Sequence, residues 1–184
     1  MAYQYNVRLH YRFLGYRPDE AQVLLANAIW VYAQYGVKLE LASYQGLELS
    51  EAGQRIVGPM VPLPTNPDFS TYPVYQYLNG LIGPVDGIPV VFVPERISHA
   101  NGLTLPVGNR VMILINNVEH TRWTLAHELG HALLNTADHD GRLGEQQDHV
   151  MHPTVDIKLP PLSAPIFTPA QVQTVYRSPF CVPN

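Results

Sequence analysis

The sequence of 184 residues has one cysteine, Cys181, so no disulfide forms within the chain. Charged residues make up only 14% of the chain, its net charge is −4, and no cluster of lysine and arginine occurs. This pattern argues against nucleic acid as a partner. No apolar run approaches the length of about 20 residues that crosses a bilayer, and the first residues lack the apolar segment of a signal peptide. We therefore expect no membrane partner, and a protein that is cytoplasmic or a mature secreted form.

An apolar content of 46% is enough for a hydrophobic core, and the length suits one domain. Many of the 17 prolines lie between residues 59 and 94 and between 153 and 183, which predicts long ordered loops. We find no internal repeat and no second domain.

The first third of the chain predicts a strand, a helix and a second strand. Residues 5–13 alternate between apolar and polar side chains, as do residues 37–44. Between them an apolar run from Ala21 to Tyr35 predicts a helix that ends at Gly36 in a left-handed conformation. Strand, helix and strand in this order favour a crossover onto a neighbouring parallel strand.

The rest of the chain gives weaker signals around a few clear elements. Residues 46–87 are rich in proline and glycine, and we expect mostly loop with a short helix near 73–79. The run from Ile88 to Pro94 is continuously apolar, as in a central strand buried on both faces. Thr168 and Pro169 predict the capped start of a last helix that reaches Arg177.

The stretch from Thr121 to Asp140 carries the main functional signal, His-Glu-Leu-Gly-His. We expect a helix here, with Thr121 as its N-cap. Residues four apart lie on the same helical face, so His127 and His131 can bind one metal ion. Glu128 is turned by about 100° from His127, which suits a group that reaches a water on the metal.

A third ligand is needed, because catalytic zinc usually has three protein ligands and a water. Asn135 tolerates the left-handed conformation that ends a helix. A turn there would bring Asp138 or His139 back towards the two histidines.

These residues resemble the metzincin clan of zinc endopeptidases, whose motif is H-E-x-x-H-x-x-G-x-x-H or -D, followed by a turn that carries a methionine. The chain departs from that pattern because Leu134 stands at the glycine position. The resemblance implies one zinc ion held by His127, His131 and His139, with Asp138 as the alternative third ligand. It implies that Glu128 is the general base and that Met151, within Asp148–Thr154, lies beneath the metal.

The resemblance also implies an α/β (α+β), zincin-like fold of one catalytic domain. It would have a twisted mixed sheet, two main helices and a small irregular C-terminal part with a closing helix. We expect an N-terminal subdomain of residues 1–134 and a C-terminal subdomain of 135–184. By the same resemblance, residues 111–115 form an inner strand. The sheet edge that binds an extended peptide substrate would consist of Gly102, Leu103, Thr104 and Leu105.

Two other interpretations compete with a monomeric metzincin-like endopeptidase. In a glutamate-zinc peptidase, Glu145 would be the third ligand, but residues 142–148 are poorly suited to the helix that usually carries it. The other is a protein without peptidase activity, either a zinc-bound binding module or a latent form in which the thiolate of Cys181 would cap the zinc. An intact Glu128 argues against a module without activity. Pro153 stands where some metzincins have a tyrosine, so we expect no tyrosine that assists the transition state.

Overall fold

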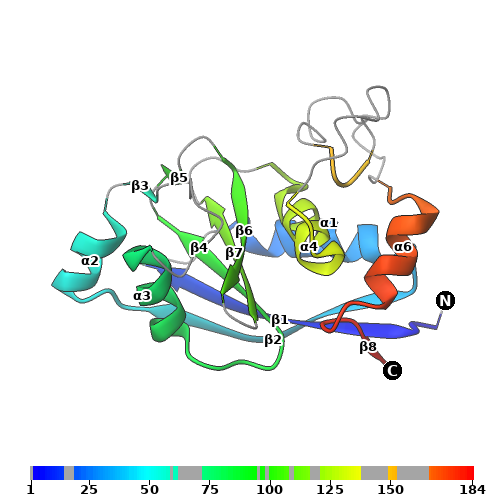
Figure 1. Ribbon diagram of the computed structural model, residues 1–184, viewed down its shortest axis with the longest axis horizontal. Helices are drawn as coiled ribbons and strands as arrows, with labels where there is room; N and C mark the ends of the chain where they lie inside the picture. The colour runs from blue at the N-terminus through cyan, green and yellow to red at the C-terminus, as the bar shows by residue number, and fades with distance from the viewer. Residues whose placement is uncertain are drawn as a thin grey trace. The chain divides into compact units, whose positions relative to one another are not determined.

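A computed structural model describes residues 2–14, 19–58, 60–61, 72–94, 96–97, 100–107, 110–116, 121–137, 149–152 and 166–184. It is a mixed α/β protein with a twisted sheet, which confirms the predicted fold class (Figure 1). Its backbone contacts divide the chain into two compact units. The first comprises Met1–Val7, Glu20–Glu40 and Thr121–Asn184, and the second comprises Arg8–Asp19 and Leu41–His120. The division into an N-terminal subdomain of residues 1–134 and a C-terminal subdomain of residues 135–184 stays a prediction.

The main sheet has the strand order β2-β1-β4-β7-β6, and β8 pairs with the start of β1. Its strands are β1 (Tyr5–Leu14), β2 (Val37–Leu47), β4 (Ile88–Val93), β6 (Gly102–Val107), β7 (Arg110–Asn116) and β8 (Val182–Pro183). β4 runs parallel to both β1 and β7, whereas β6 is antiparallel to β7. The sheet is therefore mixed, and β6 lies at one end of the order.

The central position of β4 follows from its sequence. All six of its residues are buried, as expected for a strand that is covered on both faces. Phe92 stacks on Phe13 with ring centroids 4.9 Å apart and meets Tyr11 edge to face at 5.0 Å. These contacts hold β1 and β4 in register and confirm the predicted central strand.

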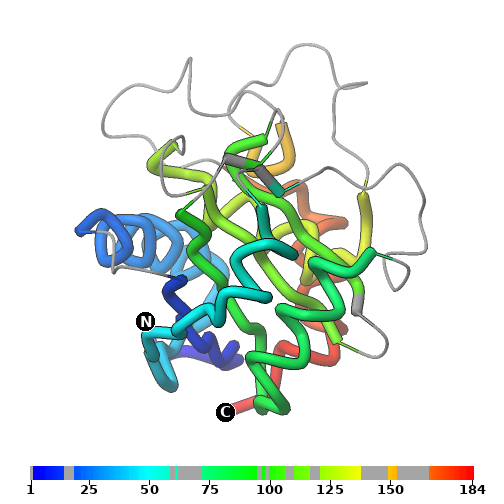
Figure 2. The backbone as a smooth tube through the Cα atoms, turned by 90° about the vertical axis from the view of Figure 1, so that its left-hand side faces the viewer, coloured from blue at the N-terminus to red at the C-terminus, as the bar shows by residue number. Residues whose placement is uncertain are grey.

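In the second unit, α2 (Glu51–Val57) and α3 (Pro73–Ile82) lie side by side (Figures 1 and 2). They share a core with the sheet that includes Val57, Tyr75 and Leu78. A two-stranded parallel sheet of β3 (Met60–Val61) and β5 (Arg96–Ile97) also belongs to this unit. The helix expected near residues 73–79 is confirmed and extends to Ile82.

The prediction of loop at residues 51–57 was wrong. Ser50 caps α2 by accepting a hydrogen bond from the Gly53 amide at 3.1 Å. Gly53 lowers the helix propensity of this segment, yet the helix needs it. A Cβ at Gly53 would lie 2.0 Å from the Tyr77 hydroxyl oxygen, so tertiary packing selects the glycine.

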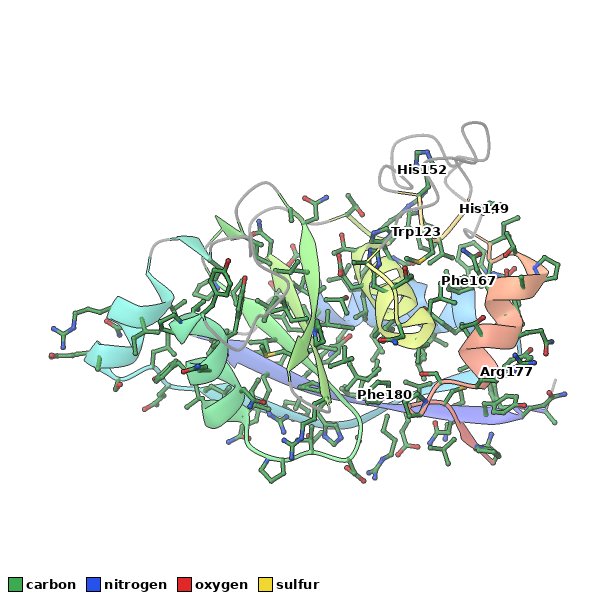
Figure 3. All side chains as sticks on the ribbon, viewed as in Figure 1. Trp123, His149, His152, Phe167, Arg177 and Phe180 are labelled. Atoms are coloured by element: carbon green, nitrogen blue, oxygen red, sulfur yellow. The ribbon has the colours of Figure 1, made fainter. Side chains whose placement is uncertain are left out.

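In the first unit, α1 (Ala21–Ala33) packs against α4 (Thr124–Leu134), which in turn contacts α6 (Pro169–Tyr176). The fully buried Tyr32 donates its hydroxyl to the Ala126 carbonyl oxygen at 3.1 Å and so joins α1 to α4. Phe167 lies against Tyr32 and Tyr35, with ring centroids 5.5 and 5.6 Å away. Figure 3 shows Phe167 near the beginning of α6.

The helix ends in this unit largely follow the predictions. Asn135 ends α4 with a positive φ, and Thr168 with Gln171 forms a full capping box on α6. Gly36 also has a positive φ, but α1 ends earlier than predicted, at Ala33 with Gln34 as its C-cap. A second difference concerns Thr121, which was predicted as the N-cap of α4. The helix begins three residues later, with Trp123 as N-cap, because the Thr121 amide itself donates to Thr124 Oγ1 at 2.8 Å.

None of the helices in the described parts of the chain is long and apolar enough to span a bilayer.

Candidate metal centre

The C-terminal end of α4 positions the second histidine of the His-Glu-Leu-Gly-His motif. Asn135 ends the helix with φ 51° and ψ 48°, and its amide donates to the His131 carbonyl oxygen. The Thr136 amide donates to the same oxygen at 3.2 Å. This turn brings the Thr136 carbonyl oxygen to 2.9 Å from His131 Nδ1. The residues directly after α4 thus supply the hydrogen-bond acceptor of His131 Nδ1.

The acceptor for His127 Nδ1 comes from a turn at residues 149–152. The His152 amide donates to the His149 carbonyl oxygen at 3.0 Å and closes the turn, and Figure 3 marks both histidines. The Val150 amide donates to the Ile166 carbonyl oxygen at 2.9 Å, and His149 and Ile166 form a parallel β-bridge. These contacts join the turn to the segment before α6. The Val150 carbonyl oxygen lies 2.6 Å from His127 Nδ1.

The two imidazole rings face each other through their remaining nitrogens. His127 Nε2 and His131 Nε2 are 3.1 Å apart, and the rings meet edge to face with centroids 4.7 Å apart. Their Nδ1 atoms both contact backbone carbonyl oxygens, which only accept hydrogen bonds, so both Nδ1 atoms carry hydrogen. In neutral rings each Nε2 then presents a lone pair. Two lone pairs at this distance repel unless a proton or a metal ion lies between them.

The nitrogen pair therefore fits a transition metal such as zinc. Backbone carbonyls that accept from Nδ1 are the usual outer partners of metal-binding histidines, because they fix the tautomer and the ring orientation. Glu128, in the same helical turn as His127, is only 5% exposed. Glu128 thus places a buried carboxyl group directly after His127 in the sequence.

Met151 lies against the motif itself. A Cβ added to Gly130 would be 2.4 Å from Met151 Sδ, 3.5 Å from Val150 Cγ1 and 3.6 Å from Phe167 Cε1. The glycine between the two histidines therefore allows the turn of Met151 to touch α4. Sequence reasoning had singled out Met151 for its spacing. It missed Val150, Thr136 and this role of Gly130, although the small residue inside the motif was a visible signal.

Several predicted residues lie outside the described residues. These are both candidates for the third ligand, Asp138 and His139, and also Glu145. Within the described ranges no group of three or more metal-binding side chains occurs, so only the two histidines of the set are placed.

Cys181, the proposed cap of a latent form, is 4% exposed in the first unit. Burial raises the pKa of its thiol to about 11, which favours the neutral thiol at neutral pH. Both observations argue against a ready thiolate cap.

The predicted substrate edge lies in the second unit. Gly102 to Leu105 are the first residues of β6, which pairs with β7 from Gly102↔Ile115 to Val107↔Arg110. β6 is the last strand in the order of the described sheet. Its role in substrate binding stays a prediction.

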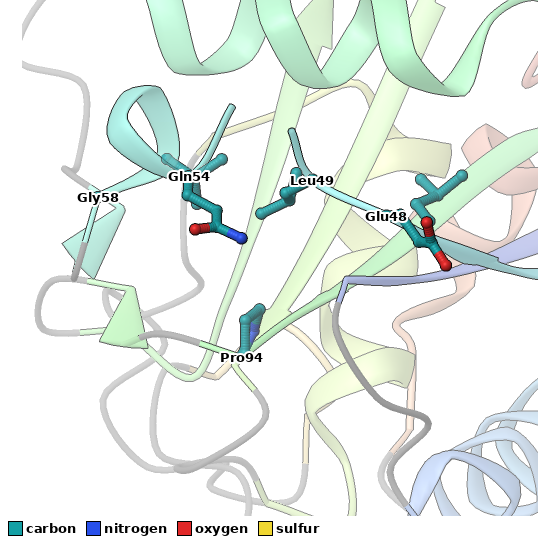
Figure 4. A pocket seen from close by; sticks show the side chains of 7 residues that line it. Glu48, Leu49, Gln54, Gly58 and Pro94 are labelled. Atoms are coloured by element: carbon teal, nitrogen blue, oxygen red, sulfur yellow. The ribbon is translucent and has the colours of Figure 1, made fainter. Parts of the chain in front are cut away.

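A separate cavity of about 450 Å³ also lies in the second unit (Figure 4). Its described lining contains no histidine, so it is not part of the metal centre. The lining residues are Leu47, Glu48, Leu49, Gln54, Val57, Gly58 and Pro94.

The arrangement of elements is that of an archaemetzincin-like fold. No protein-family model matches the sequence, and no curated protein matches it. Among solved structures, the chain is similar to archaemetzincin from Methanopyrus kandleri, with a TM-score of 0.55 and 14% identity over 94% of both chains. It is also similar to a chain in the structure of a chaperone–substrate complex, with a TM-score of 0.52 and 12% identity. That match covers 94% of this chain and 37% of the other. At these identities the similarity establishes the fold.

Proposed function

We propose that this protein is a zinc-dependent endopeptidase that binds one zinc ion through His127, His131 and a third ligand from residues 138–139. The observation that carries the proposal is the pair of Nε2 atoms 3.1 Å apart, both in rings whose Nδ1 atoms contact carbonyl oxygens. Such a pair suits a cation that both nitrogens bind. The archaemetzincin-like fold supports zinc as that cation.

In this proposal the protein's own groups orient the ligands and move a proton. Val150 and Thr136 hold the imidazoles through their carbonyl oxygens, so little reorganisation is needed for binding. When bound, zinc would polarise the scissile carbonyl and lower the pKa of a water. Glu128 would accept a proton from the attacking water and deliver it to the leaving amine nitrogen.

We propose His139 as the third ligand, with Asp138 as the alternative. The left-handed turn at Asn135 supports both, since it ends α4 only three and four residues before them. An intact Glu128 and the buried Cys181 favour the enzyme over a latent form or a binding module.

For the substrate we propose a peptide in extended conformation along β6. One side of β6 pairs with β7, and an end strand can add another strand through its outer backbone groups. A good peptide substrate should be cleaved more slowly when alternate backbone amides are N-methylated, because methylation removes the ladder donors. Equal cleavage of the methylated peptide would exclude this binding mode.

The test of the function combines metal content with peptide cleavage. Purified protein should contain one zinc per chain and cleave casein or a quenched peptide in a chelator-sensitive way. Glu128→Gln should retain the zinc and lose activity by at least about 100-fold, because general acid–base catalysis contributes roughly 10²–10⁴-fold. His127→Ala should lose the zinc. Glu20→Gln, which alters an exposed residue before α1, is the matched control and should leave both unchanged.

Two outcomes would contradict the proposal in different ways. Full activity of Glu128→Gln would exclude the proposed base. Protein that takes up no zinc, while nitrogen NMR shows an extra proton shared by His127 and His131, would assign the cation between the rings to a proton.

A further inference from the structure

A buried arginine that forms no ion pair with a carboxylate of the described residues lies in the second unit, within β1. Arg12 is 6% exposed, and its Nη1 donates to the Tyr11 carbonyl oxygen at 2.9 Å and to Ser43 Oγ at 3.1 Å. Both acceptors are neutral. Its Nε is buried without a hydrogen-bond partner, and no carboxylate of the described residues forms an ion pair with it. An arginine cannot lose its proton to relieve this situation, and an unpaired buried charge is costly.

A chain of polar contacts leads from Arg12 to the surface. Ser43 Oγ lies 2.9 Å from His10 Nδ1, and His10 Nε2 lies 3.2 Å from Asp86 Oδ1. Asp86 also forms an ion pair with Arg8. Asp86 thus contacts both the His10 imidazole and the Arg8 guanidinium. Within the described residues, the Arg12 guanidinium contacts only neutral acceptors.

The cluster of Arg8, His10, Arg12, Ser43 and Asp86 has an excess of positive charge. Two arginines and one aspartate give a local charge of +1 in a chain whose net charge is −4. Burial, and then the positive charges of Arg12 and Arg8, lower the pKa of His10. A neutral His10 can donate from Nε2 to Asp86 and accept from the Ser43 hydroxyl at Nδ1.

The charge excess has a natural partner in an anion from solution. Guanidinium groups bind oxyanions through paired N–H···O bonds, and Arg12 still has donors that no described residue uses. The Asp86 side chain is 69% exposed, so it can move away from Arg8 and His10 at little cost. Donors from three side chains match the several oxygens of a tetrahedral dianion better than the two oxygens of a carboxylate.

We propose that the cluster is a binding site for a small tetrahedral oxyanion, phosphate or a phosphate monoester, held by Arg12, Arg8 and His10. Asp86 is the internal competitor that occupies part of the site when the anion is absent. The site belongs to the second unit and does not depend on the proposed peptidase activity.

The test is a titration of the zinc-loaded protein with inorganic phosphate, followed by the NMR signals of the His10 imidazole and by calorimetry. Because phosphate also binds metal ions, the His10 signal is the decisive reading. Saturation with phosphate should shift this signal and raise the pKa of His10. Phenyl phosphate should act in the same way if monoesters fit, and acetate at equal ionic strength should bind at least about tenfold more weakly.

Four variants separate a specific site from general electrostatic attraction. Arg12→Gln and Arg8→Gln should each weaken phosphate binding by about tenfold or more, since each removes a charge-assisted contact. Asp86→Asn should tighten binding, because it removes the competitor. Arg55→Gln changes the same charge on an exposed residue of α2 and should leave the Kd unchanged.

Arg8 is 42% exposed, so Arg8→Gln tests the site even if Arg12→Gln does not fold. Phosphate binding that leaves the His10 signal unchanged would overturn the proposal. So would an equal loss of affinity in Arg8→Gln and Arg55→Gln, or weaker binding in Asp86→Asn.

Discussion

Gly130, between the two histidines of the motif, provides a sharp test of the contact between α4 and the turn of Met151. In Gly130→Ala the new Cβ would lie 2.4 Å from Met151 Sδ. Attractive contacts between such atoms begin at about 3.5 Å, so the sulfur must retreat by roughly 1 Å. Forcing extra carbon into a packed site costs about 1–3 kcal/mol, and replacing glycine by alanine inside a helix gains about 1 kcal/mol. We therefore expect Gly130→Ala to destabilise the protein by about 0–2 kcal/mol.

The clash can be isolated with a second substitution. In the background of Met151→Ala the sulfur is absent, so Gly130→Ala should there stabilise the protein by about 1 kcal/mol. The double-mutant cycle, measured by urea unfolding, should give a coupling free energy of about 1–3 kcal/mol between the two positions. Gly80→Ala is the matched control, because Gly80 lies in α3 with no atom within 4 Å of the added Cβ. That control should be stabilising by about 1 kcal/mol in either background.

The same variant links packing to the candidate metal centre. A retreat of Met151 displaces the neighbouring Val150, whose carbonyl oxygen accepts from His127 Nδ1. Loss of such an outer contact typically weakens metal binding by about 10–100-fold, and we expect a fall of about tenfold in zinc affinity. Equal stabilisation by Gly130→Ala and Gly80→Ala, with no coupling to Met151, would refute the packing argument.

Two further predictions concern the third ligand and Cys181. His139→Ala should lower zinc occupancy far more than Asp138→Ala, as measured by elemental analysis after dialysis, and the reverse order would assign the ligand to Asp138. Because burial raises the pKa of Cys181 from 9.0 to about 11, the neutral thiol stabilises the fold fully below pH 9, and this contribution is lost as the pH rises from 9 through 11. A disulfide reagent at pH 8 should therefore leave Cys181 unmodified in the folded protein and modify one thiol per chain in guanidinium chloride, whereas rapid reaction without denaturant would contradict its burial.

The sequence predicted the elements whose signals are local. The unbroken apolar run from Ile88 to Pro94 defined a strand buried on both faces, because each of its residues avoids water independently of its partners. The spacing of His127 and His131 placed both rings on one face through helical geometry alone. Asn135 ended α4 in the left-handed conformation that its short polar side chain tolerates. The capping box of Thr168 and Gln171 likewise required no distant contact.

Tertiary structure decided what depends on distant partners. Helix α2 forms around a glycine that local propensity disfavours, because Tyr77 from α3 occupies the space next to Gly53. His127 finds the acceptor of its Nδ1 in Val150, 23 residues further along the chain. The cluster around Arg12 combines side chains from β1, β2 and the loop before β4. Periodicity and spacing predict which face a residue occupies, but packing selects the group that meets it there, and in this protein that choice determined the chemistry of both candidate sites.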